Sequence, residues 1–230
     1  MKTICIHQPD FLPWLGFLHR LTQSDVFVLL DNVQFLKRGW HHRDKIKTVH
    51  GVQWLTVPVK NKGRYRQLLL ETEIDNTVDW RREHLNTLHH AYSRAACFSL
   101  YYPVLEEIYR QDYRLLTDFN ISLLNFLLQT FGIEIEILRA SSLQSTGHSN
   151  ELLIQIIREV GGQRYLTGTG AKEYLNESLF ASAGIEVMWQ NFNHPVYPQL
   201  FGNYEPYLSS IDYVLNCGGK IDWQKSTEVK

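Results

Sequence analysis

The chain has 230 residues, of which 44% are hydrophobic and 20% are charged, and its formal net charge is −1. This length and composition indicate a globular protein with a real core, and the near-neutral charge excludes recruitment of nucleic acid or membranes by an overall basic field. The three cysteines are widely spaced, and no apolar stretch reaches the roughly 18 residues of a membrane helix. We therefore expect a cytoplasmic protein without a membrane span.

The first thirty residues predict a β-strand, a helix and a second strand. Residues 3–7 form a short apolar run, and Pro13 suits the first turn of a helix that extends to residue 23. Residues 25–30 (DVFVLL) are mostly apolar, which is typical of a strand covered on both faces. A strand, a helix and a strand within this length form a βαβ unit of a parallel sheet.

The middle of the chain changes character. Residues 31–51 are polar, aromatic and basic with no clear period, and residues 52–59 alternate like a strand. Residues 68–74 are predicted to pair with that strand in a hairpin. Residues 78–131 carry apolar residues at helical spacing and predict a helical block.

Strands and helices alternate again toward the end of the chain. The pattern predicts strands at 133–141, 164–171 and 185–192, a helix at 149–162, and one or two helices within 204–219. The fold class is therefore α/β: a Rossmann-like parallel sheet with an inserted β-hairpin and a helical block. We expect residues 1–220 to form a single domain, followed by a polar tail at 221–230.

The turn after the first predicted strand reads HQPD. Ligands of open parallel sheets bind beyond the carboxyl ends of the strands. We therefore expect His7 and Gln8 to face a bound anion or nucleotide, with His7 a candidate catalytic base. The alternative is that His7 only caps the sheet edge and that the neighbouring prolines shape a turn.

A basic and aromatic loop, residues 35–47, follows the second predicted strand. Lysine and arginine bind phosphate or carboxylate, and tryptophan stacks on a sugar or a base. We predict a phosphosugar or nucleotide pocket at the same sheet edge as the first turn, against the alternative of a solvated loop; nucleic acid is less favoured because the rest of the chain is not basic. The candidate binding residues are Lys37, Arg38, Trp40 and Arg43.

Further candidates follow other strands. Thr167, Gly168 and Gly170 belong to a T-G-T-G turn through which the backbone and a hydroxyl can approach a ligand, although an ordinary tight turn explains them equally well. Asp31, after the second strand, and Asp212, on the last predicted helix, are candidate catalytic carboxylates; a surface location is the commoner explanation for such an aspartate. No histidine or cysteine spacing indicates a metal site.

The chain also resembles known proteins in two respects. FLPWLGFLHRL (11–21) is similar to the strand-to-helix turn of nucleotidyltransferases and pantothenate-synthetase-like ligases, but Trp14 and Phe17 stand where those enzymes have histidines. Over residues 3–218, the chain resembles the WbqC-like family. Where that family is expected to have W-x-N-R, this chain has His42. The resemblance is carried by the motifs HQPDFLPWLGFLHRL, DVFVLLDNVQFLKRGWHHR, WLTVPV, YLTGTGAKEYL and YPQLF…YLSSIDYVLNCG.

The WbqC-like resemblance implies a role in making surface polysaccharides or related nucleotide-linked sugars. The implied reaction is transfer of an amino acid, such as glycine, or of an acyl group to an amino sugar, with ATP and Mg²⁺ or an acyl donor as candidate cofactors. The implied partner is a small nucleotide-sugar or amino-sugar, and a homo-oligomer remains open. The alternative function is a non-catalytic protein that binds a nucleotide-sugar or a carbohydrate.

Overall fold

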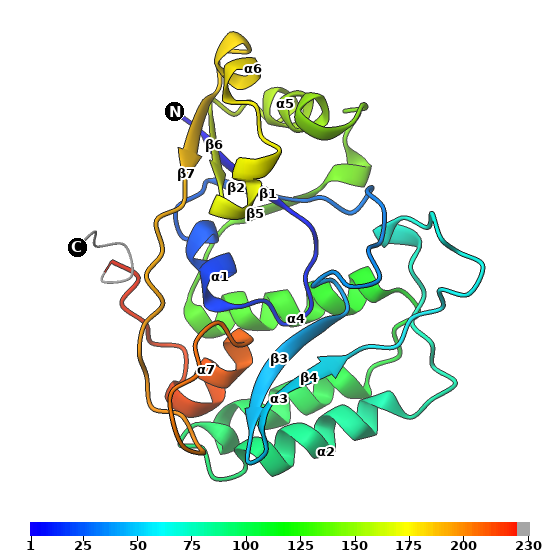
Figure 1. Cartoon of the computed structure of the whole chain (residues 1–230), viewed down its shortest axis with the longest axis vertical. Helices are drawn as coiled ribbons and strands as arrows, with labels where there is room; N and C mark the ends of the chain where they lie inside the picture. Colours follow the sequence, from blue (N-terminus) through cyan, green and yellow to red (C-terminus); the bar gives the residue numbers. More distant parts are fainter. Residues whose placement is uncertain (225–230) are drawn as a thin grey trace.

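A parallel sheet organises the upper half of the computed structural model, which describes residues 1–224 (Figure 1). Its strand order is β5-β2-β1-β6-β7, and every neighbouring pair is parallel. This arrangement confirms the predicted Rossmann-like α/β fold. The strands are β1 (Thr3–His7), β2 (Val26–Leu29), β5 (Glu136–Arg139), β6 (Arg164–Thr167) and β7 (Glu186–Trp189).

Both faces of the sheet are covered, because successive side chains of a strand point to opposite sides. Ile4 and Val26 pack in a smaller apolar cluster with α5 (Ser149–Glu159) and α6 (Glu177–Ser182). Cys5 and Phe27 belong to the larger cluster on the other face, together with residues of α1 (Leu15–Leu21) and α4 (Leu116–Phe131). Figure 1 shows α5 and α6 above the sheet and α4 crossing below it.

The helical block predicted for residues 78–131 is confirmed. It consists of α2 (Trp80–Tyr92), α3 (Phe98–Arg110) and α4, and α4 ends where Gly132 adopts a positive φ of 63°. Glycine takes this left-handed conformation without the strain that a Cβ would cause. α7 (Ser210–Cys217) packs against α3 and is shorter than the predicted segment.

The inserted hairpin exists, but the predicted pairing of residues 52–59 with 68–74 is reduced to a single antiparallel bridge between Val59 and Ile74. The pair is β3 (Arg43–Thr48) with antiparallel β4 (Gly51–Thr56), placed over α2 and α3 in Figure 1. The positive φ of Gly51, 98°, lets the chain reverse tightly at this point. Residues 68–74 instead contain a short 3₁₀ turn, η1 (Leu69–Glu71), and isolated bridges.

Two further 3₁₀ turns, η2 (Ala140–Ser142) and η3 (Thr169–Glu173), come shortly after β5 and β6, and both strands are shorter than predicted. Within residues 1–224, no helix has the length and apolar character needed to cross a bilayer. Of the predicted polar tail, residues 225–230 lie outside the described part of the chain.

Candidate functional site

A cavity of about 540 Å³ opens at the carboxyl end of the parallel sheet. This is the place where open parallel sheets bind ligands, and the volume suits a small molecule. His7 ends β1 and Thr167 ends β6 at its wall. The other lining residues include Asp10, Trp14, Arg20, Trp40, Asp44, Tyr165, Gly168, Thr169, Gly170, Tyr174, Gln190, Phe192 and Tyr207.

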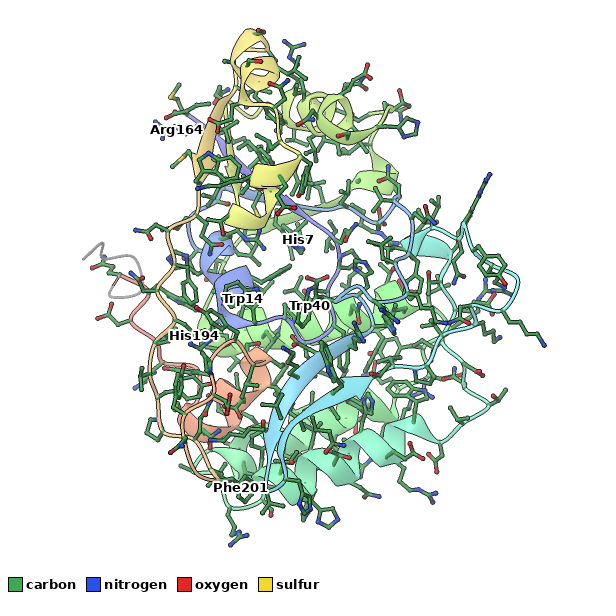
Figure 2. All side chains as sticks on the ribbon, in the orientation of Figure 1. His7, Trp14, Trp40, Arg164, His194 and Phe201 are labelled. Atoms are coloured by element: carbon green, nitrogen blue, oxygen red, sulfur yellow. The ribbon has the colours of Figure 1, made fainter. Side chains whose placement is uncertain are left out.

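The first turn and the loop that precedes β3 meet at this cavity, as the sequence predicted for these two segments. The backbone N–H of Phe11 donates to the carbonyl of Trp40 at 3.0 Å. The buried amide of Asn120 on α4 donates to the carbonyls of Pro9 and His41, at 2.8 and 2.7 Å. One side chain therefore fixes both segments, and Figure 2 shows His7, Trp14 and Trp40 around the same central region.

His7 is held in one tautomer. Its Nδ1 lies 3.0 Å from the carbonyl oxygen of Gln8, which only accepts hydrogen bonds, so Nδ1 carries the proton and Nε2 has a free lone pair. The ring packs edge-on against Phe17, with centroids 5.1 Å apart, and 31% of the side chain is exposed. Burial lowers the pKa of His7 below its ordinary value, and Asp10 opposes this effect. The imidazole is therefore a neutral base near pH 7.

Asp10 links two imidazoles. One carboxylate oxygen lies 3.5 Å from Nδ1 of His7, and the other lies 3.3 Å from Nδ1 of the buried His41. Neither ring nitrogen of His41 has a hydrogen-bond partner within the described chain. A negative charge in this position orients the ring of His7 and favours its protonated form after it has accepted a proton.

Asp44 brings a second carboxyl group to the cavity. It is buried, and the backbone N–H of Lys45 donates to its Oδ1 at 2.7 Å. Burial raises the pKa of Asp44 well above its ordinary value, and the nearby Asp10 raises it further. His7 and Asp44 are thus pushed toward their neutral forms, one able to accept a proton and the other able to donate one.

Aromatic rings form another wall. Trp14 contacts Phe192 and Tyr207, with ring centroids 5.4 and 5.7 Å apart. A Cβ at Gly16 would lie only 2.2 Å from the Trp14 ring, so the glycine is needed for the indole to lie against α1. Flat apolar walls of this kind stack on a sugar or a base.

The cations predicted from the loop at 35–47 do not line the cavity. Lys37 and Arg38 are exposed, and Arg43 donates to the carbonyl of Arg38 at 2.8 Å while its guanidinium lies 4.4 Å from the centroid of Trp54. Of that loop and β3, the cavity is lined by Trp40 and Asp44. Among the described residues, Arg20 of α1 is the one lysine or arginine in the lining.

Some of the remaining predicted residues line the cavity and others do not. Thr167, Gly168 and Gly170 line the cavity, whereas Gln8 is half-buried outside the lining. Asp31 is fully buried and accepts hydrogen bonds from Arg139 Nε at 2.7 Å and from the backbone and hydroxyl of Ser141.

Asp212 is also fully buried, under the hydroxyls of Tyr92 and Tyr197 at 2.8 and 2.9 Å, and burial raises its pKa. Asp31 and Asp212 therefore lie outside the lining, and both are already hydrogen-bonded within the fold. These contacts suit carboxylates that stabilise the structure.

Sequence patterns did not identify Arg20, Asp44 or Gln190, and they placed Asp10 at the sheet edge without making it a candidate site residue. A signal existed for Arg20, since a cation in the otherwise apolar helix LGFLHRL is unusual. Asp10 was visible three residues after His7, in the same turn. Asp44 and Gln190 carry no comparable signal because only tertiary packing brings them to the cavity. Among residues 1–224, no three His, Cys, Asp or Glu side chains are grouped so that they could hold a metal ion.

Comparison with known proteins agrees with the motifs. The family model described as "WbqC-like protein family" matches residues 8–221. A protein of Mycobacterium tuberculosis, named "Uncharacterized protein Rv1507c", is 33% identical over 222 residues, which cover 96% of each chain. No solved structure matches significantly. The family match and the relative both extend over nearly the whole chain, which therefore belongs to the WbqC-like family.

Proposed function

We propose that the chain is a transferase of surface-polysaccharide or related nucleotide-sugar biosynthesis, and that it joins an amino acid such as glycine, or another acyl group, to the amino group of a sugar. The observation that carries this proposal is that His7 and Asp44 line one cavity, where His7 is able to accept a proton and Asp44 is able to donate one. WbqC-like membership supports a biosynthetic role.

Amide formation requires a proton acceptor for the attacking amine. In the proposed step, the amine nitrogen bonds to the carbonyl carbon of an activated acyl donor while Nε2 of His7 takes the amine proton. The bond to the donor's leaving group then breaks with its electron pair, and Asp44 donates its proton to that group. Asp10 stabilises the imidazolium that forms on His7.

The walls of the cavity fit a sugar that is attached to a nucleotide. Trp14, Trp40 and Tyr207 line it with aromatic rings, which suit a sugar or a base, and Thr167 and the following glycines line it where a ligand can approach the backbone. ATP with Mg²⁺ and a preformed acyl donor are both candidate sources of activation. The same aromatic walls also support the second candidate, a protein that binds a nucleotide-sugar without chemistry.

Mass spectrometry distinguishes the two candidates. The wild-type protein is incubated with nucleotide-linked amino sugars and either glycine with ATP and Mg²⁺ or an acyl thioester, and products are searched for the mass of the amide. We expect an amide that requires the free amino group, so the N-acetylated sugar serves as the control. Saturable binding of the sugars without any product would instead support the binding protein.

A further inference from the structure

We propose that Arg20 is the anion-binding residue of this cavity and that it receives an oxyanion of the substrate, a phosphate or a carboxylate group. The inference deepens the proposed function, because it rests on the same cavity and names the charge that a substrate must carry. The sequence analysis assigned this task to Lys37, Arg38 and Arg43, which lie outside the lining.

Arg20 is buried, and the described part of the chain gives it no anionic partner. Only 7% of the residue is exposed, and its Nε is buried without a hydrogen-bond acceptor. Within residues 1–224, no carboxylate lies within 4.0 Å of its guanidinium, although other arginines of the chain, such as Arg139 and Arg164, form such pairs. Buried arginines are normally paired, so an unpaired one beside a cavity indicates that the partner is a ligand.

The surroundings of Arg20 leave room for that ligand. Gly168 follows β6, and a Cβ at this position would lie 3.0 Å from Nη1 of Arg20 and 3.8 Å from Oε1 of Gln190. The Nε2 of Gln190 donates to the carbonyl of Gly16 on the same helix as Arg20. Because Gly168 has no side chain, one side of the guanidinium stays open. The hydrogen bond from Gln190 holds α1, which carries Arg20, beside the cavity.

The two carboxyl groups that line the cavity, Asp10 and Asp44, do not form ion pairs with Arg20. Asp10 contacts His7 and His41, and Asp44 is held toward its neutral form by burial. Neither one neutralises Arg20 directly within the 4.0 Å range of an ion pair. A guanidinium matches two oxygens of a phosphate or a carboxylate with parallel N–H bonds, and this geometry suits the diphosphate of a nucleotide-sugar or the carboxylate of an amino acid.

Isothermal titration calorimetry with wild type and Arg20→Met tests the assignment without any turnover. The probes are uridine diphosphate and inorganic pyrophosphate for phosphate, and glycine for carboxylate. We expect R20M to weaken binding of either the phosphate probes or the carboxylate probe roughly 10- to 100-fold, because a pair of charge-assisted hydrogen bonds is lost. The class of probe that binds more weakly identifies the oxyanion. R66M, which removes an exposed arginine, is the matched control and should keep the wild-type Kd.

Stability and coupling provide independent readouts. Because R20M removes an unpaired buried charge, its Tm should equal or exceed that of wild type, and the bound anion should raise the Tm of wild type more than that of R20M. R20K keeps the charge and should still bind more weakly, since an ammonium is not bidentate. G168A should weaken anion binding in wild type and have little further effect in R20M.

The proposal is overturned if wild type binds none of the three probes, or if R20M and R20K both bind them with the wild-type Kd. It is also overturned if G168A weakens binding equally in both backgrounds. These results do not depend on amide formation. Anion binding through Arg20 without any product would support this inference and contradict the transferase proposal. Product formation by a fully active R20M would support the transferase proposal and contradict the role of Arg20.

Discussion

The carboxylate of Asp10 lies 3.5 Å from Nδ1 of His7, across the turn that ends the central strand β1. The same carboxylate reaches the buried ring of His41 with its other oxygen. The carboxylate of Asp10 therefore connects the turn after β1 with the loop before β3. In the proposed reaction, that charge controls how readily His7 accepts a proton.

Asp10→Asn should move the pH dependence of activity. Burial lowers the pKa of His7 and the Asp10 charge raises it, so removal of the charge lowers the pKa of His7 further. The acidic limb of kcat/KM should therefore shift to lower pH in the variant, and the plateau should fall. A pH–rate profile of both proteins measures this. An unchanged limb would show that Asp10 does not act on the base.

Asp44→Asn should remove the basic limb of the same profile. Asp44 donates a proton only while it is protonated, and burial raises its pKa, so activity of the wild type should fall as pH rises through that value. The asparagine keeps the shape of the side chain but has no proton to transfer. We expect a lower plateau without a basic limb. A basic limb that persists in D44N would assign it to another group.

Gly16→Ala should destabilise the protein, although alanine normally favours a helix. The added Cβ would lie 2.2 Å from the Trp14 ring, so the indole must leave its place on α1. We expect a loss of about 1–3 kcal/mol in the free energy of unfolding and weaker binding of aromatic ligands. Chemical denaturation monitored by tryptophan fluorescence measures the loss of stability.

Gly170→Ala is the matched control for stability, because an added Cβ there meets no atom within 4 Å. Its free energy of unfolding should stay within about 0.5 kcal/mol of wild type. Equal losses in both variants would indicate a general backbone effect and would contradict the specific contact between Trp14 and Gly16.

Acid should destabilise the fold through buried histidines. Burial lowers the pKa of His19, His42 and His84 to about 4 each. Between pH 6.5 and 4 the unfolded chain binds protons that the folded chain does not, so the free energy of unfolding falls as pH decreases, by up to roughly 1.4 kcal/mol per pH unit for each histidine. Urea denaturation at a series of pH values across this window tests the slope.

His84→Gln provides the control for that slope. Nε2 of His84 lies 3.1 Å from the carbonyl of Thr56, and a glutamine amide can donate to the same oxygen without titrating. The variant should show a shallower dependence on pH than wild type. Identical slopes would mean that the histidine does not contribute to acid sensitivity.

The parts of the fold that were predictable from sequence are those set by local patterns. The apolar strand β2 and the helical spacing of α2 to α4 identified the parallel sheet and the helical block. The hairpin partner was wrong because β3 (RDKIKT) is rich in charge, and Arg43 and Lys45 are stabilised there by contact with Trp54 of β4. Such cross-strand contacts are visible only after the strands have paired.

The candidate site was predictable to a similar extent. His7, Thr167 and the glycines after β6 follow strands that end at one sheet edge, and they line the cavity. The cations at 35–47 were expected there because their loop follows the second strand of the same sheet. Lys37 and Arg38 extend to solvent and Arg43 lies against Trp54, and position along the chain does not determine these directions. Arg20 reaches the cavity beside Gly168, the residue that follows β6, and this closeness depends on long-range contacts.

Turnover by His7→Gln tests the central claim most directly. Glutamine has a similar size and polarity but cannot accept a proton, so amide formation should fall by roughly 10²- to 10⁴-fold while the Tm stays close to that of wild type. The substrates and conditions are those under which wild type forms product. Wild-type turnover in H7Q would contradict the proposed mechanism, because the imidazole at the end of β1 would then not be the base.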